Sequence, residues 1–367
     1  MAGQIAQIFR DHFDTYAGCR KLPGHHHRAA WLIARCGRSE LGGHLERCAC
    51  AQTERIIWHS CRHRLCPRCA GTSRQKWLER EQARLLPVAH HHIVFTLPHQ
   101  LLDVWRMNRR FMNDLLFTCA SQCLRQLLDD PRYLGATPGL LIALHTWSRS
   151  GALHPHVHAM LTDGGLCDDK WVTPRRSHLL PARVLRALFR GKYLAAVRSA
   201  LEAGSLRLPH DQSIERTRSM LNALARINWH VWLTERYAHG QGLLRYLARY
   251  LRGAPVRDAQ IHYNTRAVTL AYRPHNQSAT TLSLTPHAWI ARLLEHTPPP
   301  GQHAIRRYGL YARRTHLSIS DLDLPPERIT TPRTFAQHPR PCVQCPHCLQ
   351  ALHYVQRIKP PRCNAPP

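Results

Sequence analysis

Apolar residues recur along the chain with two different periods, and these periods predict its helices and strands. Near the N-terminus, Ile5, Ile8, Phe9, Phe13 and Tyr16 follow the spacing of an amphipathic helix. The same helical spacing recurs in residues 73–86, 99–129, 182–203, 214–225, 242–252 and 286–297. Shorter apolar runs predict strands at 90–97, 140–147, 153–162 and 229–233, and alternation within 260–285 predicts more strands.

Two of the predicted strands form a hairpin, because only the turn Ser148–Gly151 and one further residue separate 140–147 from 153–162. Helices interleaved with strands, including an antiparallel pair, predict an α+β fold, in which helices flank an antiparallel sheet. From about residue 320 the chain becomes proline-rich and loses its periodicity. We therefore predict three domains: a Cys/His-rich module at 1–86, a main domain at 87–318, and a proline-rich linker with a small Cys-rich module at 319–367.

The charge of the chain narrows the class of partner. Its 367 residues carry 51 Lys and Arg against 23 Asp and Glu, a net charge of +28. Such an excess favours a polyanion, and nucleic acid is the simplest choice. A membrane is disfavoured because no apolar run reaches about 18 residues. The first residues carry no signal-peptide pattern, so we expect a cytoplasmic protein.

Ten of the 14 cysteines fall within residues 36–69 and 342–363. In a cytosolic chain, clustered cysteines hold metal more often than they form disulfides. Cys66 and Cys69 have the Cys-x2-Cys spacing with which two thiolates grip one zinc ion from a tight turn. We expect the remaining zinc ligands from Cys61, Cys48 and Cys50, with Cys36 and His44 as further candidates for the same zinc or a second one.

The tail contains a second Cys-x2-Cys pair, Cys345 and Cys348, with His347, His353 and Cys363 nearby. This pair predicts a second zinc knuckle. The other cysteines are predicted to be small buried apolar residues: Cys19, Cys119, Cys123 and Cys167.

Three histidines at alternate positions, His154, His156 and His158, share one face if residues 153–162 form a strand. Imidazole binds Mn, Zn, Ni or Co well and Mg less naturally. With phosphate and water completing the shell, Mg²⁺ or Mn²⁺ remains a candidate. The pattern therefore predicts a divalent-cation site.

Tyr246 and Tyr250 lie four residues apart on a predicted helix, so they share one side of it. A tyrosine hydroxyl is a weak nucleophile at neutral pH, but a bound cation can polarise a phosphodiester and neutralise developing charge. Attack by tyrosine would leave a 5′-phosphotyrosine bond and a free 3′-hydroxyl, and would conserve the bond energy. Arg245 and Arg249 on the same helix could clamp the phosphate, and Arg62, Arg64 and Arg68 in the cysteine module could contact DNA phosphates.

Several of these stretches together resemble one family. They are Leu41-Gly-Gly-His44, Ser60-Cys-Arg-His-Arg-Leu-Cys-Pro-Arg-Cys69, His90–Leu97, Leu153-His-Pro-His-Val-His158, Tyr246-Leu-Ala-Arg-Tyr250 and Ile305-Arg-Arg-Tyr-Gly-Leu-Tyr311. In this order, over roughly residues 25–315, the chain resembles HUH-type (His-hydrophobe-His) two-tyrosine transposases of rolling-circle insertion sequences, which carry an N-terminal zinc-binding domain.

The resemblance implies an antiparallel-sheet HUH nuclease core that cleaves and rejoins single-stranded DNA at the ends of a mobile element. His156 and His158 take the place of the metal ligands, and Tyr246 and Tyr250 that of the nucleophiles, with Tyr246 slightly preferred as the first. A third ligand is usual, and His154 is the candidate, with Asp163 and His145 as alternatives. The spacing of Cys48 and Cys50 departs from the family's Cys-x2-Cys. A bacterial, nucleoid-associated location is implied.

Two other functions fit parts of the sequence. A plasmid replication initiator or relaxase would use the same chemistry, and flanking DNA, with terminal repeats or a plasmid origin, would distinguish it. A non-catalytic, zinc-dependent nucleic-acid-binding regulator would explain the charge and the cysteines. It would not explain the histidines together with the tyrosines.

Overall fold

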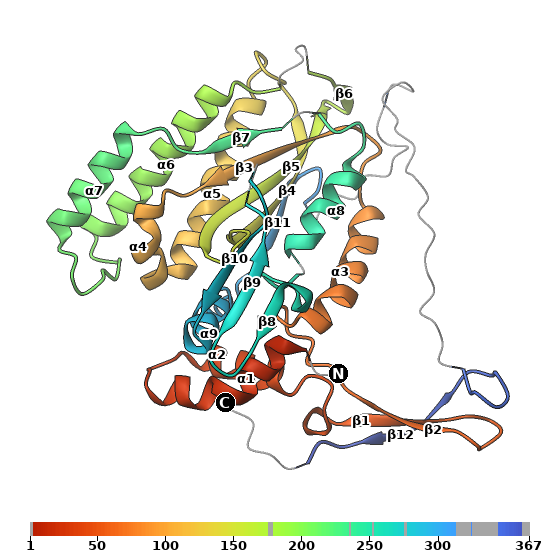
Figure 1. The fold of residues 1–367 in the computed structure, drawn as a ribbon. Coiled ribbons are helices and arrows are strands. Elements are labelled where there is room, and N and C mark those ends of the chain that lie inside the picture. The colour runs from red at the N-terminus through yellow and green to blue at the C-terminus, as the bar shows by residue number, and fades with distance from the viewer. Residues whose placement is uncertain are drawn as a thin grey trace.

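A computed structural model describes residues 3–174, 179–234, 236–251, 253–274, 277–312, 324 and 344–361, and the side chains of 249–251 lie outside the described part. Helices cover both faces of a long sheet, and a narrow arm extends from the body near the N-terminal helices (Figure 1). The helices and antiparallel sheets confirm the α+β class. No helix in the described ranges has the length and apolar character needed to span a membrane.

The central sheet is antiparallel, with its strands in the order β11-β4-β5-β3-β7 and β6 paired with the end of β5. Its strands are β3 (His90–Thr96), β4 (Thr137–Trp147), β5 (Leu153–Cys167), β6 (Lys170–Val172), β7 (Val231–Leu233) and β11 (Ile305–Gly309). The predicted hairpin is confirmed, because β4 and β5 pair with His145 opposite His156 and Ala143 opposite His158. Side chains directly opposite each other share a face, so this register gathers histidines from two strands.

One face of the sheet carries α4 (Leu102–Met107), α5 (Arg109–Leu128), α6 (Ala182–Glu202) and α7 (Ile214–Arg226). Its core includes Val157 and Leu161 from β5 with Phe117 and Phe189 from the helices. The helix predicted at 99–129 is instead a 3-10 turn (His99–Leu101) followed by two helices that meet at Asn108. The Asn108 side-chain amide donates to the Val104 carbonyl oxygen at 2.9 Å, and such bonds to the local backbone compete with a continuous helix.

The opposite face carries α8 (Gly240–Leu251) and α3 (Pro67–Gln82), which lie side by side (Figure 1). Leu243 and Leu247 of α8 pack with Trp77 of α3 against Leu141 and Met160 of the sheet. The helix α3 begins at Pro67 and not near residue 73, because proline at the first helical position presets the backbone angle that a helix needs.

A third unit joins segments far apart in the sequence. It contains α1 (Gln4–Gly18), α2 (Gly24–Ala34), a 3-10 turn (Ser39–Leu41), another 3-10 turn (Asp258–Gln260), β8 (Ile261–Tyr263), β9 (Val268–Tyr272), β10 (Thr280–Leu284) and α9 (Pro286–Leu294). The predicted N-terminal helix is confirmed as α1, whose Ile5, Ile8 and Phe9 pack with Trp289 of α9 in one core. This core crosses the predicted domain boundary at residue 86, since residues 256–294 contribute to it.

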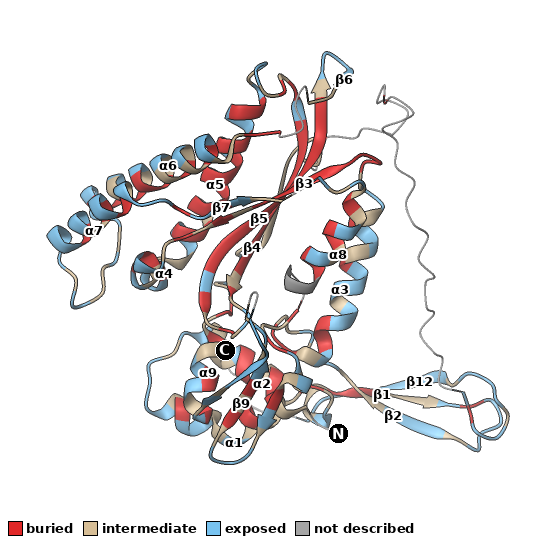
Figure 2. Ribbon diagram, turned by 45° about the horizontal axis from the view of Figure 1, so that its top comes forward, coloured by how far each residue is buried: buried red, intermediate tan, exposed pale blue. Residues whose placement is uncertain are grey.

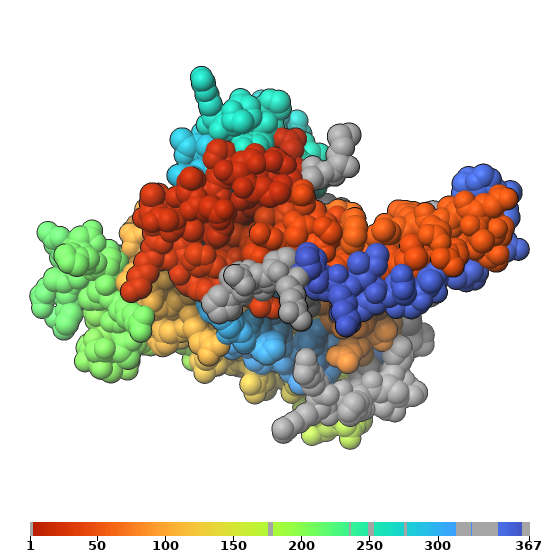
Figure 3. All heavy atoms as spheres, turned by 90° about the horizontal axis from the view of Figure 1, so that it is seen from below, coloured from red at the N-terminus to blue at the C-terminus, as the bar shows by residue number. Residues whose placement is uncertain are grey.

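The arm is a three-stranded sheet in the order β12-β1-β2, built from β1 (Gly43–Arg47), β2 (Glu54–Trp58) and β12 (His353–Ile358). It is mostly exposed, whereas the central strands are buried (Figure 2). In the space-filling view, the C-terminal residues in blue lie along the N-terminal residues in orange (Figure 3). The described part of the predicted C-terminal module is therefore paired with N-terminal strands.

Candidate catalytic site and zinc centres

His145, His156 and His158 form a buried group on the sheet face that α8 covers. His145 comes from β4 and lies directly opposite His156 of β5. His145 Nδ1 is 2.9 Å from His156 Nε2, which is 3.1 Å from His158 Nε2. Three ring nitrogens from two strands therefore converge on one point.

These nitrogens fit a divalent cation. Metal–nitrogen bonds of about 2.1 Å at right angles place neighbouring ligand atoms about 3.0 Å apart, which matches the observed separations. Burial lowers the pKa of His156 to about 3 and the pKa values of His145 and His158 well below the usual value, so the rings are neutral at neutral pH. His156 Nδ1 donates to the His154 carbonyl oxygen at 2.6 Å, which leaves Nε2 with its lone pair for a metal.

His92 of β3 contacts the outer nitrogen of His158, the one that does not face the other two histidines. Its Nε2 lies 2.9 Å from His158 Nδ1, and burial lowers the pKa of His92 to about 4. When His158 Nδ1 donates to the neutral His92 ring, His158 Nε2 stays available as a ligand. Partners of this kind orient metal-binding histidines. The sequence prediction missed His92 because it lies in a run of three histidines with no pattern that separates them.

The other two residues considered as the third ligand do not join the converging nitrogens. The imidazole of His154 is exposed and is not among the converging nitrogens. Asp163 lies between His91, whose Nε2 is 2.9 Å from one carboxylate oxygen, and Arg236, whose Nε donates to the other at 2.5 Å. Alternation along β5 places His154 on the correct face, but His145 is opposite His156 across the hairpin. Among the three candidates, the geometry favours His145.

Tyr246 lies beside the histidine group. Its ring centroid is 5.5 Å from that of His92 and 6.0 Å from that of His158, and its side chain is 38% exposed. Leu243 and Leu247 are buried against the sheet, so helical spacing leaves Tyr246 at the margin of α8, where a ligand can reach it. Tyr250 and Arg249 belong to α8, but their side chains lie outside the described residues.

A cleft of about 900 Å³ opens between α3 and the segment before β11. Its lining is rich in basic groups: Arg64, Arg80, Arg84, His303 and Arg307. Ile305 in the lining of this cleft pairs with Ala143 of β4, which pairs with His158 of β5, so one row of the sheet connects the cleft with the histidine group. Of the predicted DNA contacts, Arg62 is exposed in the loop before α3, Arg68 is exposed in the first turn of α3, and Arg245 on α8 is half-buried.

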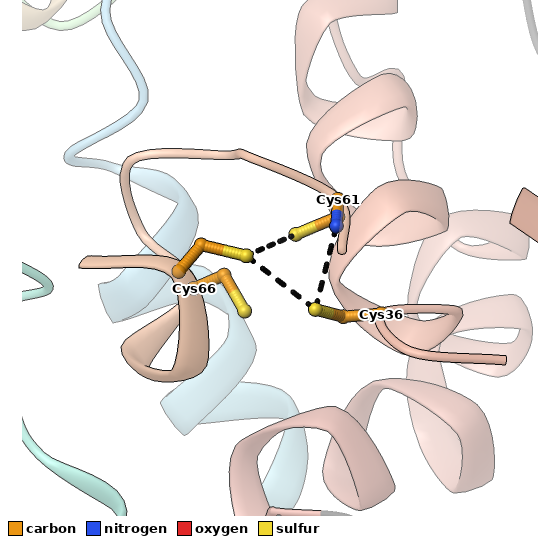
Figure 4. A group of neighbouring side chains, drawn as sticks. Cys36, Cys61 and Cys66 are labelled. Atoms are coloured by element: carbon orange, nitrogen blue, oxygen red, sulfur yellow. Dashed lines mark hydrogen bonds between the residues drawn. The ribbon is translucent and has the colours of Figure 1, made fainter. Parts of the chain in front are cut away.

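The first cysteine group consists of Cys36, Cys61, Cys66 and Cys69, all four of which have sulfurs within 4.8 Å of one another (Figure 4). Cys69 Sγ lies 3.5 Å from Cys36 Sγ and 3.6 Å from Cys61 Sγ. Zinc–sulfur bonds of about 2.3 Å in a tetrahedron place sulfurs about 3.8 Å apart. Hydrogen bonds from the other three thiols lower the pKa of Cys69, which favours the thiolate that binds metal. The group fits one structural zinc ion.

The structure separates cysteines that the sequence prediction had joined. Cys48 and Cys50 were expected to bind zinc with Cys61, Cys66 and Cys69, but they lie with Cys345 and Cys348 in a second group. The fourth sulfur of the first group comes from Cys36. The reason is the β1-β2 hairpin, which carries its tip away from the Cys61–Cys69 loop (Figure 1).

His44 belongs to neither sulfur group, since its ring lies beside Glu46 and His59. Of the four isolated cysteines, Cys119 and Cys123 are buried as predicted, whereas Cys19 and Cys167 are exposed.

Comparison with known proteins finds two matching family models. Residues 8–97 match a family model described as "Transposase zinc-binding domain", and residues 139–318 match one described as "Putative transposase". The fold and the matches define the class as a transposase with a zinc-binding domain. The first cysteine group lies within the zinc-binding match, which supports structural zinc there.

Two relatives place the chain more narrowly. It is 30% identical to "Putative transposase y4qJ" of Sinorhizobium fredii, over 98% of both chains. It is 28% identical to the "Transposase for insertion sequence element IS801" of Pseudomonas savastanoi pv. phaseolicola, over 76% of this chain and 68% of the relative. No solved structure matches the chain. The chain belongs to this family of insertion-sequence transposases.

Proposed function

We propose that this transposase cleaves and rejoins single-stranded DNA at the ends of its mobile element through a 5′-phosphotyrosine intermediate. Tyr246 is the nucleophile, and His145, His156 and His158 hold a divalent cation, Mg²⁺ or Mn²⁺. The observation that supports this most is the position of the Tyr246 ring, 5.5 Å from His92 and 6.0 Å from His158. An accessible tyrosine beside three converging imidazoles brings a nucleophile and a phosphate-binding cation to one place.

In the proposed step, the Tyr246 oxygen attacks the phosphorus and the bond from phosphorus to the 3′ oxygen breaks. The phenol loses its proton and the departing 3′ oxygen gains one, so no oxidant or nucleotide cofactor is needed. The cation, when bound, polarises the phosphodiester and offsets the charge that develops on its oxygens. Attack by another 3′-hydroxyl on the phosphotyrosine reverses the step and rejoins the DNA. Tyr250, one helical turn further along α8, would serve the second strand-transfer event.

The basic cleft would bind the DNA backbone near this centre. Arg64, Arg80 and Arg84 contribute guanidinium groups that can fork onto phosphate oxygens. Two nitrogens of the Arg307 guanidinium, Nε and Nη2, donate to the two carboxylate oxygens of Glu81. We therefore propose that Arg307 stabilises the cleft wall and does not itself bind phosphate. The chain's net charge of +28 adds long-range attraction for DNA.

We also propose Trp232 of β7, which the sequence analysis did not single out, as a DNA contact. Trp232 pairs with Val94, which pairs with His158, so the three share one row and one face of the sheet. Two strand spacings of about 4.8 Å place Trp232 about 10 Å from His158. Its side chain is 61% exposed. An exposed indole at this distance offers a surface on which a base next to the cut can stack.

The proposed function predicts a metal-dependent covalent adduct. The protein is incubated with end-labelled single-stranded DNA of the element's end, with Mg²⁺ or Mn²⁺ and with EDTA. We expect the tyrosine to retain the DNA on the 3′ side of the cut. The His145→Ala variant should form adduct at least about 1,000-fold more slowly, because losing a ligand removes several kcal/mol of charge stabilisation.

His154→Ala is the matched control, since its imidazole is exposed and outside the group. It should keep near-normal adduct formation, and circular dichroism should show all variants folded. Equal loss in both variants would contradict the assignment of His145. Absence of any adduct from the parent protein would favour a non-catalytic DNA-binding regulator.

The stacking role of Trp232 predicts a change in DNA affinity. Trp232→Ala should weaken binding of single-stranded DNA roughly 5- to 150-fold, because stacking of one base contributes about 1–3 kcal/mol. Fluorescence anisotropy measures this effect. Trp232→Phe should recover most of the affinity, and Phe111→Ala, on a helix of the opposite face, should leave it unchanged. An unaltered Kd for Trp232→Ala would rule out this contact.

A further inference from the structure

The tip of the arm brings together four sulfurs from opposite ends of the chain. Cys48 and Cys50 follow β1, while Cys345 and Cys348 precede β12, and Cys50 and Cys345 are 295 residues apart in sequence. The sulfur separations are 3.0 Å between Cys48 and Cys348, 3.3 Å between Cys48 and Cys50, and 3.7 Å between Cys50 and Cys345. A tetrahedral zinc site needs sulfurs about 3.8 Å apart, so small side-chain shifts would admit one ion.

The backbone around these cysteines is also constrained. Ala51 and Leu349, which directly follow Cys50 and Cys348, have φ angles of 56° and 59°. Residues other than glycine adopt this left-handed region rarely, and such conformations persist where the surroundings fix them. A metal bound by the preceding cysteine would provide that constraint.

Two polar groups lie beside the Cys345 sulfur. The backbone N–H of His347 donates to Cys345 Sγ at 3.4 Å, and the hydroxyl of Thr53 lies 3.1 Å from the same sulfur. Donors that surround a sulfur stabilise its charged form, which is the form that binds zinc. Thr53 belongs to the β1-β2 connection, so a residue of the N-terminal arm contacts a candidate zinc ligand of the C-terminal segment.

The three-stranded arm has no hydrophobic core of its own among the described residues. Five of the six β12 residues are exposed. In the described part of the chain, no residue of β1, β2 or β12 belongs to any of the hydrophobic cores. A three-stranded sheet without a buried face is marginal in water, and small units of this kind depend on a metal or a disulfide.

We propose that Cys48, Cys50, Cys345 and Cys348 bind a second zinc ion, which fastens the C-terminal segment to the N-terminal arm. This site is separate from that of Cys36, Cys61, Cys66 and Cys69. Two of its ligands lie far outside residues 8–97, which match the zinc-binding family model. Zn²⁺ binds all four sulfurs as thiolates, and each thiol that still carries a proton releases it, so no oxidant takes part.

Zinc content of the full chain tests this proposal. All proteins carry His156→Ala and His158→Ala, so that the histidine group takes up no zinc, and are purified under reducing conditions. We expect two zinc ions per chain in this parent. The further double change Cys345→Ser, Cys348→Ser should leave one. Cys19→Ser, Cys167→Ser is the matched control, because both thiols are exposed and outside the groups, and it should keep two.

Association of the two segments gives an independent readout. A protease site inserted between residues 324 and 344 allows the folded chain to be cut once. The C-terminal fragment of the parent should co-elute with the body in size-exclusion chromatography, and that of the Cys345→Ser, Cys348→Ser variant should separate from it. One zinc in the parent, two zincs in the double variant, or co-elution of the variant fragment would each overturn the proposal.

Discussion

Replacement of Tyr246 by phenylalanine is expected to reduce the covalent protein–DNA adduct by more than about 1,000-fold, because the variant lacks the attacking oxygen. Phenylalanine keeps the aromatic ring that lies against His92 and His158, so packing of α8 on the sheet should be preserved. Binding of single-stranded DNA should remain within about twofold, since the hydroxyl contributes little to affinity beside the basic cleft. Denaturing gels with labelled DNA measure the adduct.

Tyr250→Phe provides the comparison on the same helix. If Tyr246 acts first, Tyr250→Phe should still form an adduct on a substrate with one cleavage site but should fail to complete strand transfer. The double variant Tyr246→Phe, Tyr250→Phe should form none. If the double variant formed as much adduct as the parent, neither tyrosine would be the nucleophile. An adduct lost only in Tyr250→Phe would reverse the order of the two tyrosines.

Loss of zinc from Cys36, Cys61, Cys66 and Cys69 should unfold the N-terminal helices of the third unit, α1 and α2. Structural zinc sites supply about 10–16 kcal/mol in small zinc-dependent domains, whereas a whole domain is stable by about 5–15 kcal/mol. Cys36, Cys66 and Cys69 also belong to the core that contains Ile5 and Trp289. We therefore expect Cys66→Ser, Cys69→Ser to expose residues 3–66 to limited proteolysis and to lower the helical circular-dichroism signal.

The central sheet should survive this change, because its core with α5 and α6 shares no buried residue with the core around the zinc group. Protease-resistant fragments identified by mass spectrometry should therefore contain residues 90–233. Cys19→Ser is the control, since Cys19 is exposed and lies in neither group, and its digestion pattern should match the parent's. A parental pattern in Cys66→Ser, Cys69→Ser would show that zinc is not needed for this fold.

The local part of the fold was predictable from the sequence. The hairpin 140–162, the amphipathic helix at Ile5–Tyr16 and the α+β class follow from periodicity, which depends on neighbours along the chain. His145 was within reach of the same reasoning: once the turn Ser148–Gly151 is placed, antiparallel pairing sets it close to His156. Alternation along one strand instead favoured His154, because it takes no account of the partner strand.

The distribution of the cysteines could not be predicted in the same way. Spacing alone indicates that Cys66 and Cys69 share a metal, but it does not tell which distant residues complete the site. Cys36 reaches Cys69 because α2 packs in the N-terminal core, and Cys48 reaches Cys348 because β12 adds to β1. Both contacts depend on tertiary packing. The position of Trp232 could not be predicted for a similar reason, since only the pairing of β7 with β3 places it on the face of the histidines.

The pairing of β12 with β1 also fixes the order in which the molecule can be completed during synthesis. All strands of the central sheet precede residue 310, so that sheet can form before the last residues leave the ribosome. By contrast, the β1 edge of the β1-β2 hairpin stays unpaired until residues 353–358 have been made. A truncated gene copy that ends before residue 344 would therefore yield a chain that keeps His145, His156, His158 and Tyr246 but lacks β12 and two of the four sulfurs at the tip of the arm.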